Sequence, residues 1–188
     1  MNHSNPCFIK HFSEIPAEED VAPYPGNNEL FSIVSSFSKH IGLSKLGIHH
    51  ELLPPGRRTS LPHAESDEDE FVFVIEGAPD VWIDGTLYRL EPGVGVGFPA
   101  GTGIAHSFLN NTADPVRLLV VGEANKPSNK VVYPLNLNPE LRSHKRDQWW
   151  DDAPTRRLGS HDGKPTRPMT GGTLGARPSA HLPAAGSG

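Results

Sequence analysis

Two histidines and two glutamates are spaced so that they could hold one metal ion. His63 and Glu65 lie two positions apart, so they share a face if that stretch is extended. Glu70 opens the apolar segment EFVFVIE, and His106 lies in GIAHSFLN. A carboxylate on the inward face of such a strand needs a partner, because an unpaired buried charge is costly. Two imidazoles with one or two carboxylates are a ligand set for Zn, Mn, Fe or Ni.

The same region carries a crowded run of acids, which has two interpretations. Five carboxylates occur within positions 65–70, directly before an apolar run: Glu65, Asp67, Glu68, Asp69 and Glu70. They form either a solvated turn or a cluster in which some acids face inward around a cation. We expect Glu70 and Glu65 to face in as ligands, and Asp67 to Asp69 to form an exposed connection. Without a cation, such crowding would raise the pKa values of the carboxyls.

Four further residues and Glu65 are candidates for substrate chemistry. His49 and His50 lie on the strand before the acidic run, and one of them must face inward. Glu65 and His50 are the candidates for proton transfer, and His49 is a candidate for contact with substrate. Arg57 and Arg58 follow a Pro-Pro-Gly turn and could hold an anionic substrate. The alternative is that the histidine is a polar residue at a pocket edge and that both arginines are solvated.

Short apolar segments separated by turn residues must position these side chains. β-Branched and aromatic content predicts strands at residues 30–37, 46–53, 70–76, 80–84, 86–90, 104–109 and 116–122. Asp84-Gly85 suits a two-residue hairpin turn, and the Gly- and Pro-rich stretch 91–97 is interpreted as a turn. No sustained helical stripe is present. Many short strands at this spacing predict an all-β sandwich or barrel.

The order of these residues resembles the two sequence motifs of the cupin superfamily. The first motif is matched by Gly56, His63, Glu65, Glu70 and Gly77, and the second by Gly93, Pro99, Gly101, His106 and Asn110. The resemblance covers roughly residues 40–124 and implies a double-stranded β-helix, a small jelly-roll barrel. It departs from the family in three places. Glu65 replaces a histidine, and one extra residue precedes His63 and two precede His106.

Composition sets the limits around this barrel. The 188 residues carry a net charge of −5, which makes nucleic acid an improbable partner. Cys7 is the single cysteine, and no signal peptide or membrane-spanning stretch is evident, so the expected location is cytoplasmic. We expect an N-terminal arm at 1–29, a barrel at 30–138, an irregular docking segment at 139–168 and a disordered tail at 169–188. The resemblance also implies a homodimer, with the arm crossing to the partner.

Two classes of function fit these observations. The first is a small metalloenzyme with one divalent transition metal and a small polar organic substrate. The fold alone does not separate isomerase, lyase, decarboxylase and dioxygenase chemistry. The second is a non-catalytic cupin that binds a small molecule or serves a structural role.

Overall fold

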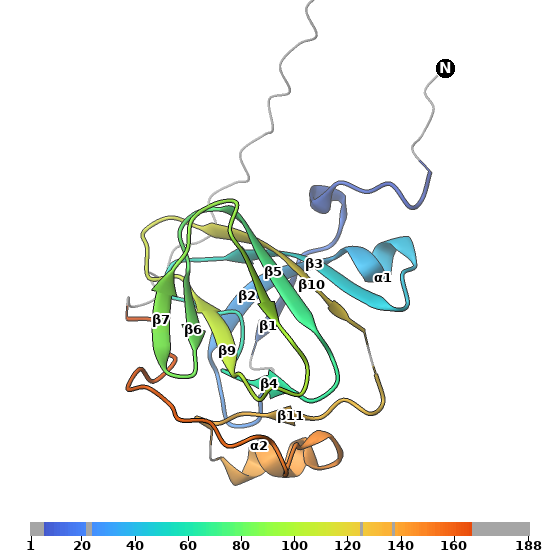
Figure 1. Ribbon diagram of the computed structural model, residues 1–188. Coiled ribbons are helices and arrows are strands. Elements are labelled where there is room, and N and C mark those ends of the chain that lie inside the picture. The colour runs from blue at the N-terminus through green and yellow to red at the C-terminus, as the bar shows by residue number, and fades with distance from the viewer. Residues whose placement is uncertain (1–5, 22–23, 125, 137, 167–188) are drawn as a thin grey trace, which may run out of the picture.

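The computed structural model describes residues 6–21, 24–124, 126–136 and 138–166, whose regular structure consists mainly of antiparallel strands (Figure 1). The strands are β1 (Glu18–Val21), β2 (Leu30–Ser36), β3 (Leu46–Leu53), β4 (Ala64–Glu65), β5 (Glu70–Glu76), β6 (Asp80–Ile83), β7 (Thr86–Arg89), β8 (Gly95–Phe98), β9 (His106–Leu109), β10 (Val116–Glu123) and β11 (Val131–Val132). Short helical segments are η1 (Phe12–Glu14), α1 (Phe37–Ile41), α2 (Pro139–His144) and η2 (Arg146–Gln148). Within these described ranges, no helix is long and apolar enough to cross a membrane.

The strands form sheets that pack face to face. The larger sheet has the order β1-β2-β3-β10-β5-β8, a second has the order β7-β6-β9, and β11 pairs with β4. Val72 and Leu118 on the inner face of the larger sheet share one buried cluster with Val81 and Phe108 from the second sheet. The result is the predicted all-β jelly-roll barrel, with its core between the sheets.

Seven of the observed strands match the segments expected from the sequence, and four do not. Asp84 (φ 45°) and Gly85 (φ 87°) form the expected two-residue turn, with Ile83 opposite Thr86. β1, β4 and β11 were not expected. The interpretation of 91–97 as a turn was wrong in its last residues, because β8 begins at Gly95 and pairs with β5.

The chain after the barrel lies along the outside of its lower end, where α2 and η2 follow β11 (Figure 1). Leu141 of α2 is completely buried in a cluster with Phe31, Leu61, Val131 and Tyr133. Trp150 is buried against Trp82 and Leu109 of the barrel. These apolar anchors fix both ends of the segment 139–150 against the barrel.

Backbone contacts continue this attachment as far as residue 163. The Trp82 indole donates a hydrogen bond to the His161 carbonyl (2.9 Å), and Gly159 N–H donates to the Asp84 carbonyl (2.7 Å). Gly85 and Gly159 approach so closely that a Cβ on Gly85 would lie 2.4 Å from the Gly159 nitrogen. The expected disordered tail, 169–188, lies outside the described residues.

The described part of the N-terminal arm lies on the larger sheet of its own chain. β1 pairs with β2 as an edge strand, and the Phe12 ring stacks on His50 at 4.3 Å. Whether the arm also reaches a second subunit stays a prediction.

Candidate metal centre

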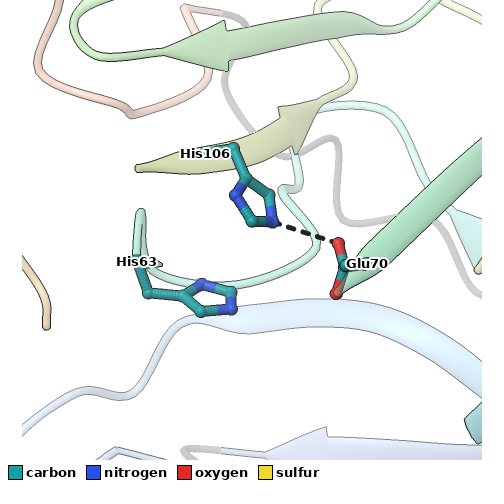
Figure 2. A group of neighbouring side chains, drawn as sticks. All are labelled: His63, Glu70 and His106. Atoms are coloured by element: carbon teal, nitrogen blue, oxygen red, sulfur yellow. Dashed lines mark hydrogen bonds and ion pairs between the residues drawn. The ribbon is translucent and has the colours of Figure 1, made fainter. Parts of the chain in front are cut away.

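His63, Glu70 and His106 bring three ligand atoms together at one end of the barrel. These atoms all lie within 4.8 Å of one another, and His106 Nε2 is 3.0 Å from Glu70 Oε1. Figure 2 shows both imidazoles and the carboxylate directed toward a common point. Two nitrogen donors and one carboxylate leave open positions on a divalent transition ion. The donor set therefore fits such an ion.

Backbone and loop contacts orient the two imidazoles. His63 and His106 form an isolated antiparallel bridge, so that their side chains project from adjacent backbone. His63 Nδ1 lies 2.9 Å from the Leu61 carbonyl, which assigns the Nδ1 proton to that bond and leaves Nε2 free to coordinate. The Phe98 ring stacks on His106 at 3.5 Å between centroids and limits rotation of that imidazole. The ligands are thus held in place by the protein itself.

The protonation states also suit metal binding. Burial, together with the neighbouring His106, lowers the pKa of His63 to about 4, although the Glu70 charge opposes this shift. His63 is therefore neutral at pH 7. Burial acts to raise the pKa of Glu70, but the hydrogen bond and charge of His106 outweigh it, and the net shift is downward. Glu70 is therefore an ionised carboxylate.

Glu65 lies beside this cluster, outside the group of three that the structure brings within 4.8 Å. A cavity of about 10 Å³, roughly the size of one water molecule, is lined by Glu65 together with Glu70 and His106. Burial, followed by the charges of Glu70 and Glu68, raises the pKa of Glu65 to about 7, while a hydrogen bond from Asn129 acts in the opposite direction. Its carboxyl is positioned to gain or lose a proton near neutral pH.

The remaining acids of the run serve the loops around the site. Asp69 is exposed and accepts a hydrogen bond from Ala100 N–H (2.7 Å). Glu68 is half-buried and accepts one from the backbone N–H of Lys126 (2.6 Å). Asp67 is half-buried and accepts one from the Ser128 hydroxyl. These three carboxylates therefore bind the neighbouring loops. Glu70 is the member of the run that belongs to the candidate metal cluster, and Glu65 lies beside it.

The two adjacent histidines of β3 point to opposite faces. His49 shares the inward face with Glu51 and the core residue Leu53, and its buried Nδ1 has no hydrogen-bond partner among the described residues. His50 is on the outer face against Phe12. The structure therefore places His49, and not His50, inside the barrel.

Both candidate arginines are engaged in structural contacts away from the cluster. Arg58 is 4% exposed, forms a two-pronged ion pair with Glu29 and donates to the Gly163 carbonyl (2.7 Å). Arg57 pairs with Glu19 and donates to the Phe31 carbonyl (3.1 Å). Both guanidinium groups therefore bind the N-terminal arm, and Arg58 also binds the C-terminal segment.

A larger chamber opens next to His63 and Glu65. Its volume is about 220 Å³, and its lining is mainly polar: His63, Glu65, Glu68, Lys126, Asn129, Val131, Tyr133, Lys145 and Gln148. Lys145 and Gln148 could not be predicted from the sequence, because the segment that carries them is polar and lacks a motif. The chamber adjoins the cluster through His63, which belongs to both.

Comparison with known proteins decides the family. The family model for the Cupin domain matches residues 49–122. A cupin-superfamily sugar phosphate isomerase from Silicibacter pomeroyi is 32% identical, with 65% of this chain aligned to 79% of that chain and a TM-score of 0.61. The chain belongs to the cupin superfamily. No functionally curated protein has a significant sequence match with it.

Two other solved structures extend the comparison of this cupin. A protein described as a sugar phosphate isomerase from Acidithiobacillus ferrooxidans is 26% identical, over 68% of this chain and 81% of that chain, with a TM-score of 0.62. A polyketide cyclase from Streptomyces resistomycificus is 18% identical over 76% of this chain and 98% of that chain, with a TM-score of 0.56. At that identity the likeness to the cyclase concerns the cupin fold alone.

Proposed function

We propose that this cupin is a metal-dependent enzyme that moves a proton within a small polar organic substrate, as in an aldose–ketose isomerisation. The observation that carries the proposal is the position of Glu65. Glu65 lines both the small cavity that it shares with Glu70 and His106 and the larger chamber that it shares with His63. The two relatives described as sugar phosphate isomerases support the same class of reaction.

The cluster and Glu65 have different tasks in this proposal. A divalent ion held by His63, Glu70 and His106 would act as a Lewis acid on a substrate oxygen. Glu65 takes a proton from the carbon beside a carbonyl group and returns it to the carbonyl carbon. The hydroxyl proton passes to the former carbonyl oxygen, so the reaction needs no oxidant or reductant. Two neighbouring carboxyls with pKa values shifted in opposite directions are typical of such a division of roles.

Hydrogen–deuterium exchange tests the proposal directly. Protein loaded with Mn²⁺, Fe²⁺, Ni²⁺ or Zn²⁺ is incubated in D₂O with aldoses, ketoses and their phosphate esters, and NMR follows deuterium at the carbon beside the carbonyl. Glu65→Gln should retain the metal and lose exchange at least about 100-fold, the usual effect of removing a general base. Glu91→Gln, at an exposed turn, is the matched control. A chain that takes up no metal and catalyses no exchange would instead be a binding or structural cupin.

We further propose that the protein is a homodimer that pairs through the outer face of the larger sheet. Phe71 and Ile75 of β5 are both 44% exposed there, and Leu46 of β3 is 43% exposed. An apolar sheet face of this kind is suited to packing against its own copy around a two-fold axis. Light scattering should give a dimer mass for the wild type and a monomer mass for Ile75→Lys. A monomeric wild type would contradict this arrangement.

A further inference from the structure

The chamber beside the metal cluster contains two ammonium groups, and their surroundings differ. Lys126 Nζ lies 2.6 Å from Glu123 Oε2, donates to the Asp67 carbonyl (2.6 Å) and lies 3.7 Å from the Asp67 carboxylate. Its charge is therefore balanced by Glu123 at the end of β10 and by Asp67 in the loop between β4 and β5. Among the described residues, no carboxylate lies within 4.0 Å of Lys145 Nζ. Its side-chain hydrogen bond is to Gln148 Oε1 at a long 3.4 Å. Lys145 thus brings to the chamber an ammonium group without an ion-pair partner among the described residues.

Neither acid of the chamber forms an ion pair with Lys145 among the described residues, and each has a hydrogen-bond donor of its own. Glu68 accepts the backbone N–H of Lys126, and Glu65 accepts a hydrogen bond from the Asn129 side chain. In the proposed function Glu65 also exchanges its proton with substrate. Lys145 and Gln148 also line the chamber, and both come from the segment after β11.

Lys145 is held by its backbone at a junction between two helical segments. It ends α2, where its N–H donates to the Leu141 carbonyl (3.0 Å), and it precedes the first residue of η2. Leu141 is fully buried on one side of this junction, and Trp150 is buried on the other. Lys145 is itself half-buried, whereas the flanking His144 and Arg146 are exposed. A cation whose backbone is fixed in this way loses less entropy when it binds a ligand.

We infer that Lys145, assisted by Gln148, binds an oxyanion at the end of the substrate farther from the metal ligands. The inference rests on the proposed function and names its substrate class, a short hydroxylated molecule with a terminal phosphate or carboxylate. The chamber volume of about 220 Å³ corresponds to roughly seven water molecules at about 30 Å³ each, which suits a chain of a few carbon atoms. The ammonium group binds the negative charge that phosphate and carboxylate share, and experiment shows which of the two the site prefers.

Three probes with one carbon skeleton test this site: glycerol, glycerate and glycerol 3-phosphate. Each is titrated into ¹⁵N-labelled protein, both metal-free and loaded with Zn²⁺, and NMR shifts give the Kd. In the wild type the anionic probes should bind at least about tenfold more tightly than glycerol, the effect of one charge-assisted hydrogen bond. Lys145→Met should abolish that preference, and Lys145→Arg should keep most of it. The anion that loses more affinity in Lys145→Met is the one the site prefers.

The control removes the same charge from a neighbouring surface. Lys130→Met takes an exposed lysine from the loop before β11 and should leave the preference for anions within about twofold, because an exposed charge that does not line the chamber is screened by salt. The inference is overturned if wild type and Lys145→Met bind the three probes alike, or if Lys130→Met has the same effect as Lys145→Met. Failure of the proposed function would be seen separately, as absent metal uptake or absent deuterium exchange, because the anion preference is also measured without metal.

Discussion

His63 and His106 exchange both backbone hydrogen bonds, His63 N–H to the His106 carbonyl at 3.2 Å and His106 N–H to the His63 carbonyl at 2.9 Å. The two imidazoles of the metal cluster therefore belong to one antiparallel pair, although they come from different sequence motifs. Because the backbone alone makes this bridge, the frame of the site does not depend on the histidine side chains. Coordination and folding can thus be separated by mutation.

The first prediction uses this separation. His63→Ala and His106→Ala, alone and together, should fold like the wild type and lose affinity for divalent transition metals at least about 100-fold, since losing a ligand costs no less than losing an outer-shell partner. Metal titration in competition with a chelator measures the loss, and far-UV circular dichroism checks the fold. His144→Ala, which changes an exposed histidine of α2, should keep wild-type affinity. Full affinity in the double variant would place the metal elsewhere.

The second prediction concerns Glu65, where the chain departs from the cupin pattern. Because Glu65 lies outside the three-residue cluster, Glu65→Ala should weaken metal binding by less than about fivefold, the effect of losing a nearby screened charge. Glu65→His should recreate the three-histidine, one-glutamate set and shift preference toward softer ions if the new imidazole reaches the metal. A loss of more than about 100-fold in Glu65→Ala would show that Glu65 becomes a ligand when metal binds.

The third prediction concerns pH and Glu51, an inward-facing carboxyl of β3. Burial raises its pKa to about 7, against an opposing hydrogen bond from the Ser32 hydroxyl (2.7 Å). An acid whose pKa is raised by folding contributes stability at low pH that is lost as the pH rises through the folded value. The contribution of Glu51 should therefore fall between about pH 4.5 and 7. The loss is at most about 3 kcal/mol at 1.36 kcal/mol per pKa unit, and less because the side chain is half-buried.

Glu51→Gln isolates this contribution from other titrating groups. The difference in unfolding free energy between the variant and metal-free wild type, measured in urea from pH 5 to 8, should move in favour of the variant as the pH rises. A difference that is constant with pH would mean that Glu51 is already ionised in the fold.

The fourth prediction compares two truncations. Removal of residues 170–188 should leave the melting temperature unchanged, because that sequence has almost no large apolar residues. Removal of residues 158–188 should lower it by several degrees, since it also deletes the acceptors of Trp82 and buried Arg58 at His161 and Gly163. Differential scanning calorimetry measures both. Equal melting temperatures would show that the contacts at 159–163 contribute no stability.

Much of the barrel could be predicted because its strands are rich in β-branched and aromatic residues and are separated by turn residues. The segment at β5 places Glu70, Val72 and Val74 inward and Phe71, Phe73 and Ile75 outward, as its period of two requires. β8 escaped prediction because its outward positions are glycines. The Phe71 ring lies over Gly95, and a Cβ added to Gly95 would be 2.6 Å from that ring. The position must therefore be a glycine, and the strand lacks a side chain that would have revealed its pattern. β4 and β11 have two residues each, too few for any periodicity.

Features of the site that follow from the alternation of side chains along a strand could be predicted. Features that depend on contacts between distant segments of the chain could not. Counting back from the core residue Leu53 in steps of two selects His49 over His50 as the inward histidine. No comparable rule connects Arg58 to Glu29 or leaves Lys145 without an acid, because those outcomes depend on segments far apart in the chain.

The chamber wall made by Lys145 and Gln148 is the last part of the site in the order of the chain. The four residues around the metal position precede it by at least 39 positions, since His106 is followed by Lys145 only after β9, β10 and β11. In the proposed function, metal chemistry and selection of the substrate's far end would therefore be encoded in separate stretches of the gene. Exchange of the segment around α2 and η2 between related proteins offers a route to altered specificity that leaves the metal ligands unchanged.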